Sequence, residues 1–235
     1  MKHFGAESLD FLRRLARNNA KPWFEAHRGE YEQYVKQPMS DLVEEMDLRM
    51  ARFAPEMVGH PKRSVFRIHR DIRFSPDKSP YKTHAACWFF HRDGSAKVGR
   101  GAHGGGAGFY FHLQPGASFV GGGCWRPPRP ALQKFRAVIA GDARGFERVV
   151  LAPSMRRFAG LSEEEMLRRV PRGYGQDHPA ARWLRHQSFT VGRRLTDAQV
   201  TGARLTTMLE ADYRTMLPLV RWLNGTLGLA PLRRR

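Results

Sequence analysis

Residues 65–83 gather more side chains that could do chemistry than any other stretch of this 235-residue chain. The candidates for substrate binding are Arg67, Arg70, Arg73, Lys78, Tyr81 and Lys82. Asp71 and Asp77 lie between them and are the candidate catalytic residues, because a carboxylate can orient an arginine or accept a proton. Guanidinium groups donate paired hydrogen bonds that match phosphate and carboxylate groups. The segment therefore predicts an anion-binding site.

The same residue types also fit a structural interpretation. A salt-bridge network of arginine and aspartate that ties a turn to a sheet would need the same side chains. The sequence leaves both interpretations open, and a network of this kind could also bind an anion.

Alternating apolar residues predict the element that positions these groups. The apolar members of the series are Phe66, Ile68, Ile72 and Phe74. Their period of two predicts a strand over residues 65–74, paired antiparallel near the middle of a sheet. Arg70 falls among the apolar positions, so we expect its guanidinium to be held inward beside a carboxylate or a bound anion. Ser75-Pro76-Asp77 and Pro80 then predict a tight turn after the strand.

Read together, the spaced residues of this segment resemble the defining motif of an uncharacterised bacterial and fungal protein family. The residues that carry the resemblance are Arg67, Arg70, Asp71, Arg73, Phe74, Asp77, Lys78 and Tyr81. The resemblance extends from Asn18-Asn19 and Trp23-Phe24 to Trp222-Leu223, which is nearly the whole chain. Because the function of that family is unknown, the resemblance implies no cofactor, substrate or catalytic residue.

A second group of polar residues lies at Arg172, Tyr174, Asp177 and His178. A histidine on a polar loop can act as a general acid or base near neutral pH, so His178 is a candidate catalytic residue and Tyr174 a candidate substrate contact. The alternative is that Asp177 caps a helix that begins near Pro179. The ten histidines show no spacing typical of a metal site, so we assign no metal, and the cofactor is unknown.

Composition narrows the classes of partner. The chain contains no apolar run of about 18 residues, so we expect no membrane partner, and a cytoplasmic location is the default. The net charge is +18, and it is uneven: residues 61–140 contain fourteen Lys and Arg against three Asp and Glu. Such a field attracts phosphate-bearing small molecules or nucleic acid. The oligomeric state cannot be deduced.

The remaining patterns predict a single α+β domain, with an antiparallel sheet and helices before and after it. Residues 1–60 are expected to form helices, 61–125 a basic region rich in strands, and 126–235 mainly helices. The other expected strands are 85–90, 109–113, 118–125 and 188–191. Helix starts are expected at Ser8, Pro22, Pro38, Asp142, Ser162, Thr196 and Pro218.

The leading hypothesis is a protein that binds, and could process, a phosphorylated small molecule or nucleotide. The alternatives are a nucleic-acid-binding module and a scaffold without enzymatic activity, and whether the protein is an enzyme stays open. A concave pocket lined by the arginines would favour the first hypothesis. An extended basic face with exposed aromatic residues would favour the second, and a motif paired within itself would favour the third.

Overall fold

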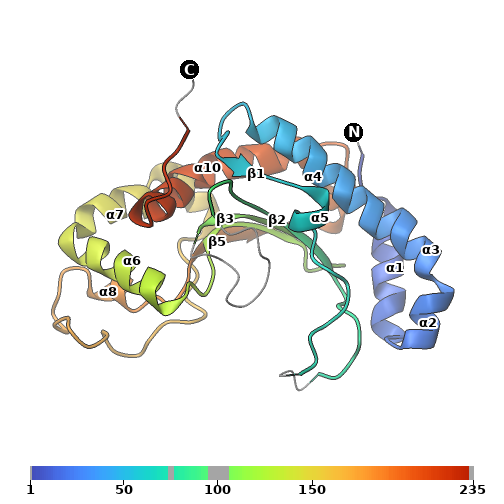
Figure 1. Ribbon diagram of the computed structural model, residues 1–235, viewed down its shortest axis with the longest axis horizontal. Helices are drawn as coiled ribbons and strands as arrows, with labels where there is room; N and C mark the ends of the chain where they lie inside the picture. Colours follow the sequence, from blue (N-terminus) through green and yellow to red (C-terminus); the bar gives the residue numbers. More distant parts are fainter. Residues whose placement is uncertain (1, 74–76, 95–105, 233–235) are drawn as a thin grey trace.

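Five antiparallel strands form the centre of the molecule in the computed structural model, which describes residues 2–73, 77–94 and 106–232 (Figure 1). Their spatial order follows the chain: β1 (Met57–Val58), β2 (Ala85–His91), β3 (Gly108–Leu113), β4 (Phe119–Cys124) and β5 (Phe189–Arg194). Cys87 pairs with Phe111, which in turn pairs with Val120. Helices precede and follow the sheet along the chain, which confirms the predicted α+β class.

The longest helix, α10 (Leu205–Thr226), packs on one face of this sheet together with α4 (Gln37–Met50) (Figure 1). Phe109 of β3 stacks on Tyr213 of α10 with ring centroids 4.6 Å apart. A Cβ atom at Gly122 would lie 2.8 Å from Met216 Sδ, so glycine allows β4 to approach the helix closely. Apolar side chains of alternate strand residues thus meet the buried face of α10.

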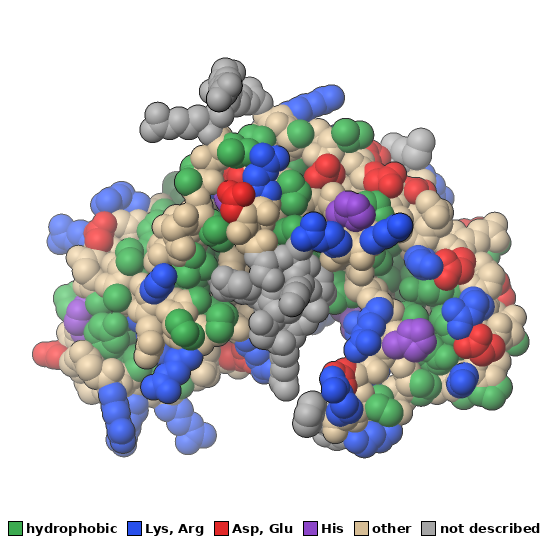
Figure 2. Space-filling model, viewed as in Figure 1, with side chains coloured by type: hydrophobic (Ala, Val, Ile, Leu, Met, Phe, Trp, Pro, Cys, Tyr) green, Lys and Arg blue, Asp and Glu red, His purple; other side chains and the backbone are tan. Residues whose placement is uncertain are grey.

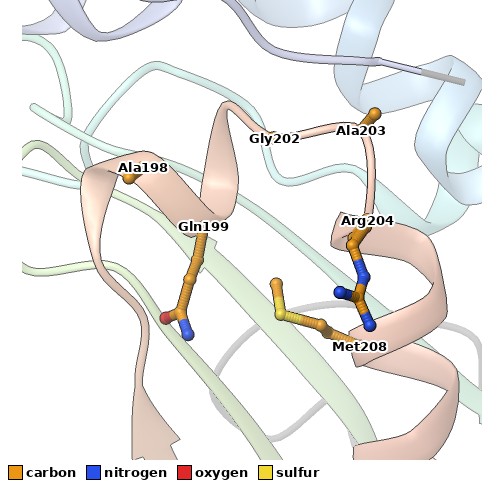
Figure 3. A pocket seen from close by; sticks show the side chains of 6 residues that line it. All are labelled: Ala198, Gln199, Gly202, Ala203, Arg204 and Met208. Carbon is orange, nitrogen blue, oxygen red and sulfur yellow. The ribbon is translucent and has the colours of Figure 1, made fainter.

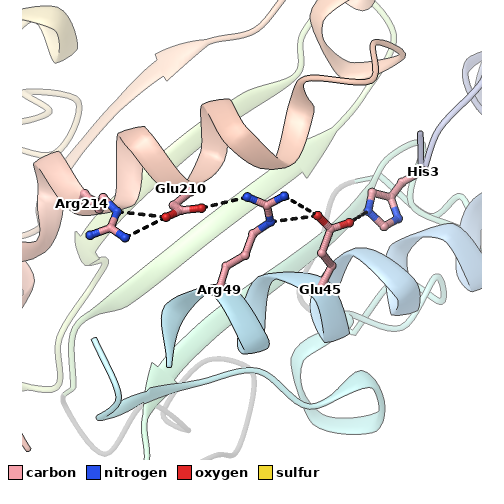
Figure 4. A network of polar contacts seen from close by, with 5 residues as sticks. All are labelled: His3, Glu45, Arg49, Glu210 and Arg214. Carbon is pink, nitrogen blue, oxygen red and sulfur yellow. Dashed lines mark hydrogen bonds and ion pairs between the residues drawn. The ribbon is translucent and has the colours of Figure 1, made fainter. Parts of the chain in front are cut away.

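Charged side chains connect α4 to α10 along the edge of this contact (Figure 4). Arg49 Nη1 lies 2.9 Å from Glu210 Oε2, and Arg49 also pairs with Glu45. Glu45 in turn accepts a hydrogen bond from the His3 ring at 2.8 Å, which fixes the N-terminal segment. Glu45 of α4 thus pairs with His3 and Arg49, both within the N-terminal segment.

The N-terminal segment is helical, as expected. Its elements are α1 (Ala6–Arg17), α2 (Lys21–Ala26), α3 (Arg28–Tyr31), the π-helix η1 (Glu32–Lys36) and α4. Gly5 N–H donates to Ser8 Oγ at 3.1 Å, so Ser8 satisfies a backbone donor from inside the first turn of α1. Phe11 and Tyr31 pack with their ring centroids 5.9 Å apart, which joins α1 to α3.

The shorter helices lie on both sides of the sheet. They are α5 (Pro61–Ser64), which contacts β2, then α6 (Arg129–Gly141), α7 (Ala143–Val150), the 3-10 helix η2 (Pro153–Phe158), which contacts β5, α8 (Ala181–Leu184) and α9 (Asp197–Val200). The predicted caps at Asp142 and Thr196 are confirmed. Asp142 Oδ1 accepts from Gly145 N–H at 2.7 Å, and Thr196 and Gln199 satisfy each other's backbone N–H groups.

Four predicted helix starts or caps are wrong. Ser8 lies within the first turn of α1, whose N-cap is Gly5. Pro218 lies inside α10, where the neighbouring Leu217 and Leu219 are buried, and this burial outweighs the cost of about 3 kcal/mol for an interior proline. Ser162 opens no helix, because its N–H donates to Thr190 O of β5 at 2.8 Å. Asp177 does not cap α8, since the helix begins at Ala181, and the N–H of Ala180 bonds to the His178 ring instead.

Candidate functional site

Residues 66–73 and 77–83 run side by side as the two arms of a projecting segment, which we call the motif hairpin (Figure 1). Val65 makes a single bridge to Cys87 at the edge of β2 that also pairs with β1, and His69 makes a single bridge to Tyr81. Arg70 N–H donates to Pro80 O at 2.9 Å, and Lys82 N–H donates to Ile68 O at 2.8 Å. These bonds close the hairpin at its base.

The prediction of a central strand over residues 65–74 is therefore wrong. Ile68 is buried, but Ile72 is 41% exposed and Phe74 lies outside the described residues. The alternation does not produce a strand of the sheet here, because the segment pairs with the returning arm of its own hairpin. Its apolar side chains therefore have no sheet face against which to pack.

Asn19 anchors the returning arm of the hairpin to the N-terminal helices. Its Oδ1 accepts from Tyr81 N–H at 3.0 Å, and its Nδ2 donates to Tyr81 O at 2.9 Å. The Tyr81 ring is buried and stacks on Phe24 with centroids 4.1 Å apart. Tyr81, a candidate for substrate binding, thus lies in the core and positions the hairpin. Sequence reasoning missed Asn19, because no local pattern relates residues 62 positions apart.

Arg70 is held inward by two contacts. Its Nη1 lies 2.7 Å from Asp77 Oδ2, and its Nη2 donates to Tyr81 O at 3.3 Å. The expected pairing of Arg70 with a carboxylate is thus present. Its Nε is buried and finds no hydrogen-bond partner among the described residues.

The remaining charged residues of the hairpin tip are engaged locally. Asp71 Oδ2 lies 2.8 Å from Arg73 Nη2, and this hydrogen bond lowers the pKa of Asp71 well below its usual range. The N–H of Ser79 and then Arg70 lower the pKa of Asp77. Lys78 Nζ donates to Ile72 O at 2.9 Å. Both carboxylates stay ionised and hydrogen-bonded, which suits an orienting role better than proton abstraction.

Arg67, Arg70 and Lys82 form what we call the cation cluster. Lys82 Nζ donates to Arg67 O at 2.8 Å. Burial lowers the pKa of Lys82, and the neighbouring charges of Arg67 and Arg70 lower it further. The Arg67 side chain is exposed and makes no ion pair within the described part of the chain. Asp77 is the one carboxylate that pairs with the cluster among those residues, so the three cations keep an excess of positive charge.

Two histidines that the sequence analysis did not single out lie between the cation cluster and Phe119 of β4. The rings of His84 and His112 lie 4.2 Å apart. Burial lowers the pKa of His84 to about 3, helped by His112, Lys82 and Arg70. His112 Nδ1 accepts from the Tyr110 hydroxyl at 3.0 Å, and its Nε2–H donates to Gln114 Oε1 at 2.9 Å. Both rings are thus favoured as neutral imidazoles near neutral pH.

The second candidate group stays separate from the first. Its loop lies near α8, across the sheet from the motif hairpin (Figure 1). The rings of Tyr174 and His178 are 6.1 Å apart, and His178 Nδ1 accepts from Ala180 N–H at 3.0 Å. Asp177 and Arg172 are exposed. The structure therefore does not bring His178 or Tyr174 to the cation cluster.

Two hollows formed by the described residues lie away from the motif hairpin. One is lined by Ala198, Gln199, Gly202, Ala203, Arg204 and Met208, and Figure 3 shows Gln199, Arg204 and Met208 around it. The other is lined by Ala6, Glu7, Asp10, Arg14, Glu30 and Tyr34. Neither of these two hollows includes a residue of the motif hairpin. In the described ranges no group of three or more His, Cys, Asp or Glu side chains could hold a metal ion.

Comparison with protein families gives one match, to the model of a conserved hypothetical protein family, DUF2461, over residues 7–222. The chain belongs to this family. The expected membership of an uncharacterised family is thus confirmed, and DUF2461 assigns no activity. No curated protein matches, and no solved structure matches. Within the described residues of this DUF2461 chain, no helix is both long and apolar enough to cross a membrane.

Proposed function

We propose that the protein binds a phosphate-bearing ligand at the cation cluster, and that this ligand is a nucleic acid strand. The observation that carries the proposal is the excess of cations at Arg67, Arg70 and Lys82, which lie close enough to lower the pKa of Lys82. Holding like charges together costs free energy, and a bound phosphate would reduce that cost. The exposed guanidinium of Arg67 can donate paired hydrogen bonds to such a group.

The exposure of Lys62, Arg63 and Arg67 favours a polymer over an enclosed small molecule. Small ligands are usually bound in pockets that cover most of their surface, and the two hollows described above do not include the hairpin. Figure 2 shows Lys and Arg side chains spread over α5 and along the motif hairpin. Lys62 and Arg63 of α5 make no ion pair among the residues described. A row of unpaired cations suits the repeating phosphates of a nucleic acid.

The contacts of the hairpin support a structural role for some of its residues. Asn19 and Arg70 converge on the carbonyl of Tyr81, while Asp77 holds Arg70. These residues keep the hairpin in one position and so preorganise the cation cluster. Asp71 and Asp77 then serve as orienting groups for Arg73 and Arg70.

Cys87 and Cys124 are both buried and form no disulfide with each other, which fits a cytoplasmic location.

A salt titration tests the proposal. The affinity for a labelled single strand, followed by fluorescence anisotropy, should fall steeply between about 50 and 200 mM salt. Arg67→Gln should weaken binding and reduce the slope of log K against log salt by about 1, since it removes one phosphate contact. Arg144→Gln is the matched control, because Arg144 is exposed on α7 and has no ion pair among the described residues. Equal losses in both variants, or no binding by the wild type at low salt, would reject the proposal.

A further inference from the structure

Trp125 directly follows β4 and is 50% exposed, which is unusual for so large an apolar side chain. The guanidinium carbon of Arg126 lies over its ring at 4.8 Å from the centroid. An arginine stacked on an indole extends the planar surface and adds a positive charge to it. Among the other large apolar side chains exposed in the described chain, Phe119 is the aromatic one, but it is only 36% exposed and its ring already stacks on His112.

The turn that presents Trp125 is held in a strained conformation. Arg126 has a φ of 45°, a left-handed value that a residue with a side chain rarely adopts. Three contacts keep it there: Ser188 Oγ accepts from Arg126 N–H at 2.9 Å, the Ser188 hydroxyl donates to Glu165 at 3.1 Å, and Arg126 pairs with Glu165. This network fixes the guanidinium that lies over the indole, so the pair is preorganised.

The strand register relates Trp125 to the cation cluster. Gly122 of β4 faces α10, so Phe119 and Trp125, of opposite parity, belong to the other side of the strand. Phe119 stacks on His112 at 4.7 Å, and His112 contacts His84 beside the cation cluster. Trp125 lies six residues beyond Phe119, just past the end of β4 at Cys124, and so about 20 Å from Phe119. A single strand of several nucleotides can span such a separation, because single-strand-binding folds contact about 4–16 nucleotides.

We propose that Trp125, backed by Arg126, is a stacking platform for an unpaired nucleobase of the strand whose phosphates bind the cation cluster. This inference rests on the proposed function and narrows the ligand to a single-stranded nucleic acid. The protein would recognise it through the stacking of one base on Trp125 in addition to the charge of its phosphates. Aromatic side chains stack on any base, so the platform selects for unpaired bases without reading sequence. A duplex, whose bases are already stacked, gains nothing from Trp125.

The test compares two ligands of equal charge, a single strand of about twelve nucleotides and an abasic strand of the same length. Trp125→Ala should weaken binding of the base-containing strand about tenfold or more. It should leave binding of the abasic strand unchanged. Trp125→Phe should retain most of the affinity, and Leu151→Ala, which also truncates an exposed apolar side chain, should change neither ligand.

The outcomes separate the two proposals. If the wild type binds both strands and Trp125→Ala weakens neither, or weakens both equally, the stacking platform is rejected and the proposed function stands. If Arg67→Gln weakens both strands while Trp125→Ala weakens only the one with bases, both proposals hold. If the wild type binds neither strand at low salt, the proposed function fails and the platform fails with it.

Discussion

The charged residues of the motif hairpin divide into those that hold the loop and those available to a ligand. Arg70 contributes to both, because it pairs with Asp77 and with the Tyr81 carbonyl while its Nε stays without a partner among the described residues. Arg67 is exposed and unpaired within that part of the chain, so its charge is directed to solvent. A single hairpin thus combines a structural network with a basic surface.

Arg70→Met should cost about 1 kcal/mol of unfolding free energy. The carboxylate of Asp77, left without its partner, has a side chain that is 53% exposed and can be solvated, and Tyr81 O keeps its bond from Asn19. Urea unfolding of wild type and variant measures the difference. A loss above about 3 kcal/mol would show that Arg70 belongs to a fully buried network instead.

His84 should make stability depend on pH. Its pKa is about 3 in the folded protein, mainly through burial, against 6.5 in an unfolded chain. As the pH falls below 6.5, the unfolded chain takes up a proton that the folded protein does not, so stability present above pH 6.5 is lost progressively toward pH 3. The slope approaches at most about 1.4 kcal/mol per pH unit and is smaller for a partly solvated ring.

His84→Phe keeps the ring contact with His112 and removes the titration. The comparison is the urea midpoint at pH 7 and at pH 5 for both proteins. The wild type should lose more stability than the variant over this interval. Equal losses in the two proteins would contradict the lowered pKa of His84.

At the scale of elements, the position of the hairpin depends on contacts distant in sequence. The hairpin meets β2 at Val65, which bridges Cys87, and at Phe66, whose N–H donates to Ala86 O. The bonds between Asn19 and Tyr81 and the stack of Tyr81 on Phe24 hold its returning arm. A loop anchored in this way keeps the cation cluster in place without belonging to a continuous strand.

Asn19→Ala should destabilise the protein by about 1–3 kcal/mol, because it leaves the Tyr81 N–H unpaired in a part-buried site. The amide of Tyr81 should also exchange faster with deuterium. Asn18→Ala is the control, since Asn18 Nδ2 donates only to the exposed Arg14 carbonyl, and it should leave Tyr81 exchange unchanged. Unaltered exchange in Asn19→Ala would refute the anchoring role.

Local patterns predicted the elements whose residues act locally. The strands β2 to β5 carry short apolar or alternating runs, and the caps at Asp142 and Thr196 bond to residues three positions away. The hairpin was predicted as a strand because its apolar residues alternate with polar ones. That pattern is the same whether the segment pairs with a sheet or with its own returning arm. Tertiary burial also overrode the signal of Pro218. The cation cluster could be listed from sequence, but the His84 contact, the Asn19 anchor and the exposure of Trp125 depend on the fold.

At the scale of the whole molecule, the charge of +18 makes the few buried carboxylates important for stability. Asp212 of α10 is fully buried and pairs with Arg193 of β5 at 2.7 Å and with Arg157 of η2 at 2.8 Å. It therefore connects the central helix to the last strand and to the 3-10 helix beside it.

Asp212→Ala should cost about 3–5 kcal/mol, because it removes the shared partner of two arginines from a buried site. Arg157→Ala should cost less than about 1 kcal/mol, since Arg157 is itself 43% exposed and Arg193 still pairs with the carboxylate. Thermal or urea unfolding measures both. Similar costs for the two variants would contradict the assigned geometry.

The most direct test of ligand binding at the cation cluster is an NMR titration of the arginine side-chain Nε–H signals with a single-stranded oligonucleotide. The Nε–H signal of Arg70, unpartnered among the described residues, should shift in a saturable way at low salt, together with the amides of the motif hairpin, and the shifts should reverse at high salt. The Nε–H of Arg49, which is paired with Glu45, should stay in place as an internal reference. Saturable shifts elsewhere in the protein with Arg70 and the hairpin unchanged would contradict the account.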